Sequence, residues 1–184
     1  MNESEFVDIF EKAANQIIGN KLNIIKGANL YYELSLDKNL QLSVDLSKKP
    51  MRGNSAFQTD ICIFEKSRKI LIPRVVIEFK TGISTHDVIT YSCKAGKHKK
   101  IYPWLRYGLL ASEHQLIPDR FFIHNEFLDF FITAKKFKKG DKLLSMVKDL
   151  INKEVRTSRT LEKIFFGENQ YNYYRTETIF RDFK

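Results

Sequence analysis

Two apolar runs rich in strand-forming residues constrain the fold of this chain more than any other feature. The first run covers Phe57–Phe64, the second covers Ile70–Phe79, and the polar segment Glu65–Lys69 between them is typical of a turn. Together they predict two adjacent antiparallel strands. Because Pro73 has no N–H to donate to a ladder, we expect the second strand to be bulged there or to begin its regular part afterwards.

Helical spacing is found on both sides of this pair. Apolar residues between Phe6 and Ile17 recur every three or four positions, which predicts an amphipathic helix over Glu5–Gly19. After the strands, Ser84 or Thr85 can cap a helix that runs from about His86 to Lys100. The other expected elements are hairpin strands over Leu30–Leu36 and Leu40–Leu46, a loop over Ser47–Ser55, strands over Arg106–Ser112 and Phe121–Phe131, and a helix over Asp141–Val155.

This order of elements predicts an α/β fold of the mixed α+β kind, in which a central mixed β-sheet is flanked by helices. The 184 residues fit a single domain over 1–184. We place its core at about residues 5–132 and expect a helical and aromatic C-terminal extension over 140–184. The segment from Leu161 onwards receives no further assignment.

The charge of the chain points to a polyanionic partner, because 31 Lys and Arg stand against 22 Asp and Glu, a net charge of +9. No acid occurs between Asp87 and Glu113, and aromatic residues interleave with the basic ones there. Cations neutralise phosphates and aromatic rings can stack on bases, so this segment is a candidate nucleic-acid surface. A solvated helix face is the alternative. The DNA-contact candidates are Tyr91, Lys94, Lys97, Lys99, Lys100 and Arg106.

Several functional classes lack support in the sequence. No apolar run approaches the roughly 18 residues of a membrane span, and the acidic first ten residues do not resemble a secretion signal. Only Cys62 and Cys93 are present, so we expect a reduced, cytoplasmic setting and no zinc site. The glycines are isolated rather than grouped in a phosphate-binding loop, so we expect no nucleotide cofactor.

Three charged residues stand out in the apolar strands. Side chains alternate along a strand, so Glu78 and Lys80 project from the same face, and Asp60 lies on the preceding strand. Asp60 and Glu78 would converge if the register permits. Two close carboxylates need a cation, and Mg²⁺, which prefers oxygen ligands, is expected there. A surface salt bridge between strand-edge charges is the alternative interpretation.

The order Asp60, seventeen residues, then Glu78-Phe79-Lys80 resembles the core of the PD-(D/E)xK nuclease superfamily, which has the restriction-endonuclease-like fold. Gln58–Phe64 matches the first acidic strand, with Thr59 where the family often has proline, and Val75–Thr81 matches the second. The resemblance implies a metal-dependent nuclease. Asp60, Glu78 and the backbone carbonyl of Phe79 would carry Mg²⁺, and Lys80 would act on the attacking water.

The resemblance also implies roles outside the two strands. Many family members add a glutamate from the first helix, for which Glu11 is the candidate here, with Glu5 and Glu33 behind it. The helix after the motif often positions DNA, so Tyr91 and Lys94 become phosphate-contact candidates. On that helix Asp87, Tyr91, Lys94 and His98 form one polar stripe. We expect the opposite face, with Ile89, Cys93 and Gly96, to pack on the sheet.

Three functions remain open. The first is a Mg²⁺-dependent endonuclease of double-stranded DNA, most like a small type II restriction enzyme acting as a homodimer, since a chain of this length has little room for separate recognition and cleavage domains. The second is a structure-selective nuclease, such as a Holliday-junction resolvase, a repair nuclease or a transposon-end nuclease. The third is a non-enzymatic, basic nucleic-acid-binding module or an inactive nuclease relative.

Overall fold

A five-stranded mixed sheet forms the centre of the structure, a computed structural model that describes residues 2–44, 49–53, 55–137, 139–168, 171–173 and 175. The strand order is β1-β4-β5-β6-β7, and β2 and β3 form a separate two-stranded sheet. The elements are α1 (Glu3–Ile17), β1 (Leu22–Lys26), β2 (Asn29–Tyr31), β3 (Ala56–Gln58), β4 (Ile61–Ser67), β5 (Ile70–Lys80), α2 (Thr85–Ile101), β6 (Arg106–Ala111), α3 (Asp119–His124), β7 (Phe130–Thr133) and α4 (Gly140–Phe165).

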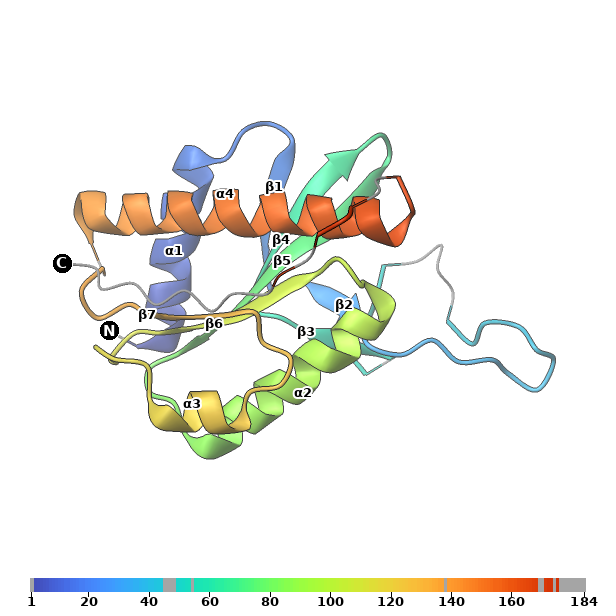
Figure 1. The fold of residues 1–184 in the computed structure, drawn as a ribbon, viewed down its shortest axis with the longest axis horizontal. Helices are drawn as coiled ribbons and strands as arrows, with labels where there is room; N and C mark the ends of the chain where they lie inside the picture. The colour runs from blue at the N-terminus through green and yellow to red at the C-terminus, as the bar shows by residue number, and fades with distance from the viewer. Residues whose placement is uncertain are drawn as a thin grey trace.

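Helices cover both faces of this sheet. The β1–β4 and β4–β5 pairs are antiparallel, whereas β5–β6 and β6–β7 are parallel. Helices α1 and α4 lie on one face, and α2 and α3 lie on the other (Figure 1). The predicted fold class, a mixed sheet flanked by helices, is therefore confirmed. Among the described residues, no helix is both long and apolar enough to span a membrane.

Strand β5 divides the apolar core in two, because its side chains alternate between the faces. Val75, Ile77 and Phe79 join the cluster under α1 and α4, and the rings of Phe6 and Phe10 from α1 pack edge-on against Phe79. The buried apolar residues of α4 between Leu143 and Val155 belong to the same cluster. Val76 joins the cluster under α2 and α3. Glu78 comes next on that second face, so a carboxylate is buried where apolar packing would otherwise continue.

The bulge expected near Pro73 is present. Phe64 pairs with Pro73 and Ile63 pairs with Val75, so Arg74 is the extra residue on β5. The bulge re-aims the buried Arg74 toward α4. Its guanidinium bonds Glu65 at 2.8 Å and Glu162 at 2.7 Å. This cluster ties the C-terminal half of α4 to the sheet.

The expected hairpin over Leu30–Leu36 and Leu40–Leu46 is wrong for the residues described. Only Asn29–Tyr31 forms a strand there, and it pairs with Ala56–Gln58 instead. A turn with a single bridge, Leu36 to Leu42, remains of the hairpin, and residues 45–46 lie outside the described part. Leu36 and Leu40 are largely exposed, and a two-stranded ribbon without an apolar face to cover is marginal in water.

The expected loop over Ser47–Ser55 has no strand or helix at its described residues, while 47, 48 and 54 lie outside them. Two further differences concern strands. Leu22–Lys26 forms β1, which pairs with β4 and was not predicted. The run Phe57–Phe64 is divided between β3 and β4 at Thr59 and Asp60. The glycine between β1 and β2 makes this division possible, since Gly27 adopts a positive φ of 67° and an added Cβ would meet Gln58 at 3.1 Å.

The expected strand over Phe121–Phe131 is wrong in its first half. Asp119–His124 forms α3, with Pro118 before it and Asp119 in its first turn, and the strand β7 begins only at Phe130. Helix α4 extends to Phe165, ten residues beyond the expected end at Val155. Arg74 pairs with Glu65 and Glu162, and Arg159 pairs with Glu65. These ion pairs hold the added stretch of α4 against the sheet.

Candidate metal-binding and catalytic site

The candidate site lies where β5 runs past the beginning of β4. The last pair between these strands is Ile61 with Ile77, so Asp60 faces the continuing end of β5. The amide of Phe79 donates to Asp60 Oδ2 at 2.8 Å, and the amide of Asp60 donates to Glu78 Oε2 at 3.2 Å. The structure therefore brings Asp60 and Glu78 together, and each carboxylate is oriented by the backbone of the other strand.

The break before β4 holds Asp60 in this position. Thr59 donates from its backbone N–H and from its hydroxyl to the carbonyl of Ala28, at 2.8 and 2.9 Å, and Gly27 donates to the carbonyl of Asp60 at 3.0 Å. Proline has neither a backbone N–H nor a hydroxyl, so the residue that often precedes the acid in the nuclease superfamily would lose both bonds that Thr59 donates to Ala28. The backbone before Asp60 is therefore held by the hydrogen bonds of Thr59 and not by the rigid ring of a proline.

Glu78 is a buried carboxylate with two donors on one oxygen. The residue is about 1% exposed. Lys94 Nζ and the hydroxyl of Tyr107 each lie 2.5 Å from Glu78 Oε1. Burial raises the pKa of Glu78, the Lys94 ammonium opposes this rise, and the charge of Asp60 adds to it. Lys94 is thus the cation that favours the ionised carboxylate in a buried place.

The position of Lys94 reverses the expected orientation of α2. The sequence predicts an outward stripe of Asp87, Tyr91, Lys94 and His98, with Ile89 and Cys93 against the sheet. Instead Lys94 reaches Glu78, His98 is fully buried, and Ile89 and Cys93 are exposed. The physical reason is Glu78 itself, because a buried carboxylate on the sheet face is stabilised by a cation from the helix above it. Of the expected packing face, only Gly96 is buried, where an added Cβ would meet the ring of Phe127.

Lys80 lies at the mouth of the site between two helices. Its ammonium is 3.1 Å from Glu3 Oε2 in α1 and 5.6 Å from the ring centre of Tyr91 in α2. Burial lowers the pKa of Lys80, but its hydrogen bonds with Tyr91 and Glu3 and the charge of Glu3 outweigh it, so the pKa is raised above its ordinary value. Lys80 is therefore protonated at neutral pH. It can stabilise negative charge, but it is poorly suited to accept a proton from water.

The oxygen donors at this place fit a hard cation. Asp60 and Glu78 supply carboxylates, and Phe79 supplies a backbone carbonyl on the side of its Asp60-bound amide, since both groups of one strand residue point the same way. Among the described residues no cluster of three or more His, Cys, Asp or Glu side chains forms a ready metal cage. Mg²⁺ usually binds one or two carboxylates and keeps several waters, so this donor set matches Mg²⁺ better than a cage-bound metal.

The three acid candidates from the sequence take different places. Glu5 forms the capping box of α1 with Asn2, and Glu33 is exposed after β2. Glu11 is half-buried on α1. The hydrogen bond that Lys26 donates to Asp8 raises the pKa of Lys26, and the charges of Asp8, Glu11 and Asp60 add to this rise. The α1 acid that contacts a site residue is Glu3, through Lys80. No periodicity in the sequence points to Glu3, because the contact joins residues 77 positions apart.

The expected DNA-contact residues fall into two groups. Lys99 and Arg106 are engaged inside the fold, since both bind Asp129 at 2.7 Å and Arg106 also binds Glu154 at 2.7 Å. Burial lowers the pKa of Lys99 against the opposing charge of Asp129. Lys97 and Lys100 are exposed on α2. Tyr91 stands between Lys80 and Lys94, and burial with the charge of Glu78 raises its pKa to about 12, so its phenol is neutral.

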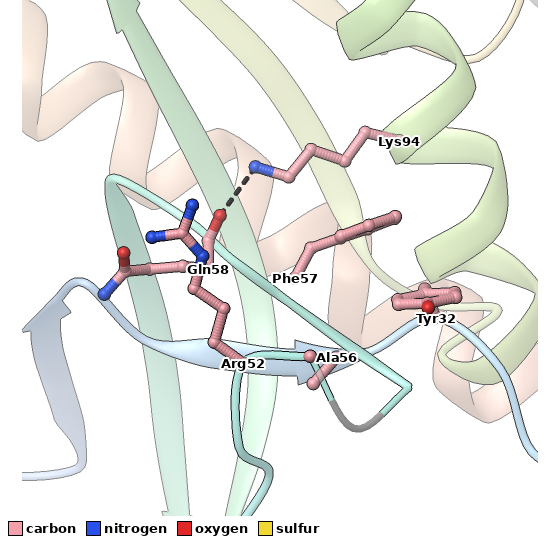
Figure 2. Close-up of a pocket in the computed structure, with 7 residues that line it drawn as sticks. Tyr32, Arg52, Ala56, Phe57, Gln58 and Lys94 are labelled. Carbon is pink, nitrogen blue, oxygen red and sulfur yellow. Dashed lines mark hydrogen bonds between the residues drawn. The ribbon is translucent and has the colours of Figure 1, made fainter.

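A pocket of about 420 Å³ is lined by Lys94, which contacts Glu78, and by Gln58, two residues before Asp60. Figure 2 shows Lys94 reaching across from α2 to the backbone carbonyl of Gln58, which it bonds at 2.6 Å, with the rings of Phe57 and Tyr32 beside it. Arg52 approaches from the other side (Figure 2). No sequence pattern indicated this pocket or the hydrogen bond from Tyr107 to Glu78. The pairing of β2 with β3 creates the pocket, and the expected hairpin excluded that pairing.

Comparison with protein-family models finds no match for this chain, and a search of curated proteins finds no relative either. The resemblance to the nuclease superfamily therefore stands on the residues and on their arrangement.

Proposed function

We propose that the protein is a Mg²⁺-dependent endonuclease that hydrolyses phosphodiester bonds of DNA, and that it belongs to the PD-(D/E)xK superfamily. The convergence of Asp60 and Glu78 at the end of β5 carries this proposal. Asp60, Lys80 and Lys94 remain partly exposed beside the buried Glu78, so a phosphate can approach the pair. An isolated surface ion pair joins one carboxylate to one cation. Here a second carboxylate lies beside the first, and backbone amides hold both of them.

The residues have distinct roles in this reaction. Asp60, Glu78 and the carbonyl of Phe79 would hold Mg²⁺, which supplies Lewis-acid chemistry and a bound water of lowered pKa. Lys80, held protonated, stabilises negative charge on the phosphate. Lys94 and Tyr107 fix one oxygen of Glu78, and Lys94 favours its ionised form. The other oxygen, Oε2, faces the amide of Asp60.

A restriction-like role on double-stranded DNA is the finer part of the proposal. Cutting both strands calls for two such sites, which a twofold-symmetric homodimer would provide. A structure-selective nuclease is the second candidate, and the aromatic pocket beside the carboxylates favours it, since stacking surfaces bind unpaired bases. A non-enzymatic binding module is the third, and the existing Lys94–Glu78 pair would suit a site that needs no metal.

Product patterns distinguish these candidates. Supercoiled plasmid and linear phage DNA are incubated with the protein in Mg²⁺ or in EDTA, alongside Asp60→Ala and Lys80→Ala. Lys148→Ala, which removes an exposed cation from α4, is the matched control. Discrete bands lost in EDTA and in both site variants indicate sequence-specific cleavage, and nicks or smears lost in the same way indicate structure-selective cleavage. No cleavage of duplex or branched DNA by wild type contradicts the proposal.

A further inference from the structure

The pocket beside the carboxylates has an aromatic wall that is already assembled. The rings of Tyr32 and Phe57 stack at 4.0 Å between centroids with 17° between their planes. His98 packs edge-on against Phe57 at 5.8 Å, and its Nδ1 lies 3.0 Å from the carbonyl of Tyr31. Both rings remain half-exposed although they are held from behind. Because the two rings stack on each other, the face that a planar ligand can cover is the outer face of one of them.

The same pocket is cationic and has a polar end. Lys97 Nζ lies 5.1 Å from the centroid of Tyr32 and 5.6 Å from that of Phe57, so its charge is held at the aromatic wall. Arg52 adds a second positive charge, whereas the charge of Lys94 is paired with Glu78, and none of the described lining residues is acidic. Gln58 also lines the pocket, but its side-chain Nε2 donates to the carbonyl of Gly27 at 3.2 Å. A planar ring attached to phosphates matches the aromatic wall and the cations.

The pocket shares a wall with the candidate metal site. Lys94 Nζ bonds Glu78 Oε1 at 2.5 Å and the carbonyl of Gln58 at 2.6 Å. Gln58 is two residues from Asp60, and an extended chain spans at most about 3.3–3.6 Å per residue, so their backbones are at most about 7 Å apart. A ligand in the pocket and a phosphate at the carboxylates can therefore be neighbours on one strand.

We propose that this pocket binds an unpaired nucleobase of the DNA strand whose phosphodiester lies at Asp60 and Glu78, an inference that rests on the proposed function. A paired base inside a duplex is covered on both faces by its neighbours, so only a single-stranded, mispaired or extruded base reaches such a wall. The ring stacks on the outer face of the Tyr32–Phe57 pair, and Arg52 and Lys97 neutralise the flanking phosphates. The pocket volume of about 420 Å³ falls within the usual range for ligand sites.

Binding in EDTA tests this pocket without requiring cleavage. Fluorescence anisotropy compares a labelled single strand, its perfect duplex, and the same strand with abasic sites in place of the bases. Base stacking on aromatic side chains is strong enough that wild type should bind the intact strand about 5- to 100-fold more tightly than the abasic strand. Tyr32→Leu and Phe57→Leu should lose most of this ratio. Phe122→Leu, which alters an exposed ring on α3, should keep it.

Each outcome bears on a separate claim. Equal affinity of wild type for intact and abasic strands overturns the pocket, whether or not the protein cuts DNA. Unchanged ratios in Tyr32→Leu and Phe57→Leu, with folding verified by circular dichroism, overturn it as well. Competition by free dAMP at the same concentration as the oligonucleotide also overturns it, because the pocket would then be a mononucleotide site. Loss of the ratio in both variants supports the pocket even if no DNA is ever cleaved, in which case only the nuclease proposal fails.

Discussion

Asp60 and Glu78, eighteen residues apart, are joined by the backbone amide of Asp60, which donates to Glu78 Oε2 at 3.2 Å. The next amide along β5, that of Phe79, donates in turn to Asp60 Oδ2 at 2.8 Å. Each carboxylate is thus oriented by the main chain of the opposite strand, and Lys94 and Tyr107 hold the other oxygen of Glu78. The position of the pair depends on the register of β4 against β5, which the buried residues of both strands determine.

Replacing Lys94 by methionine should destabilise the fold. Glu78 would then be buried without its cation, and breaking one side of a buried ion pair costs about 3–5 kcal/mol. Urea unfolding at pH 7 measures the loss. Lys94→Met combined with Glu78→Gln should recover a large part of it, whereas Lys97→Met, one turn along α2, should have little effect. A loss below about 1 kcal/mol in Lys94→Met would show that Glu78 does not depend on this cation.

Lys80→Arg should retain measurable cleavage activity, whereas Lys80→Gln should lose it by about 10²- to 10³-fold. The contacts with Tyr91 and Glu3 raise the pKa of Lys80 despite burial, so the site uses its positive charge, which arginine preserves. Single-turnover rates of plasmid cleavage at saturating Mg²⁺ make the comparison. Equal loss of activity in both variants would instead indicate that Lys80 must release a proton.

His98 makes the fold sensitive to acid. Burial lowers its pKa to about 4 from an ordinary value of 6.5, against the hydrogen bond with the carbonyl of Tyr31. The unfolded chain therefore binds a proton more readily, and stability present above pH 6.5 is lost as the pH falls toward 4. The full difference is about 3 kcal/mol. His98→Phe, which keeps a ring against Tyr107, should show a smaller loss between pH 7 and pH 4.5 in urea unfolding. If wild type and His98→Phe lost the same unfolding free energy between pH 7 and pH 4.5, the acid sensitivity would not come from His98.

The two cysteines should differ sharply in reactivity. Cys93 is exposed on the outer face of α2, whereas Cys62 is buried in β4, where burial and the charge of Glu78 raise the pKa of its thiol. A colorimetric thiol reagent at pH 8 should modify one cysteine of the native protein and both after denaturation. Cys93→Ser should abolish the native reaction. Protection of Cys93 in the native protein would contradict the orientation of α2.

Part of the site follows from local sequence, and part does not. Alternation along Val75–Lys80 predicts that Glu78 and Lys80 share a face, and the apolar pattern predicts the strand itself. The orientation of α2 was mispredicted because polar helix residues are ordinarily expected to face solvent. Lys94 instead faces the sheet because of a carboxylate sixteen residues away, which no helical periodicity records.

The sequence also did not predict which distant segments pair with one another. The run 30–46 alternates like a hairpin, but Leu34, Leu36, Leu40 and Leu42 remain exposed, and Asn29–Tyr31 pairs with Ala56–Gln58 across a long connection. That pairing also places Tyr32 beside Phe57 and so builds the pocket. The ion pairs of Arg106 with Asp129 and Glu154 likewise join distant elements, which a charge run on the sequence cannot distinguish from an exposed surface.

The rate of DNA hydrolysis as a function of Mg²⁺ concentration, compared between wild type and Asp60→Asn, tests the central claim most directly. Asparagine preserves the size of the side chain and an oxygen for the Phe79 amide, but it removes the charge that would hold the metal. We predict saturable, Mg²⁺-dependent cleavage by wild type and a rate at least about 100-fold lower for Asp60→Asn, with both proteins binding DNA in EDTA with similar affinity. Equal rates in the two proteins, or wild-type cleavage that persists in EDTA, would contradict a metal-dependent site at Asp60 and Glu78.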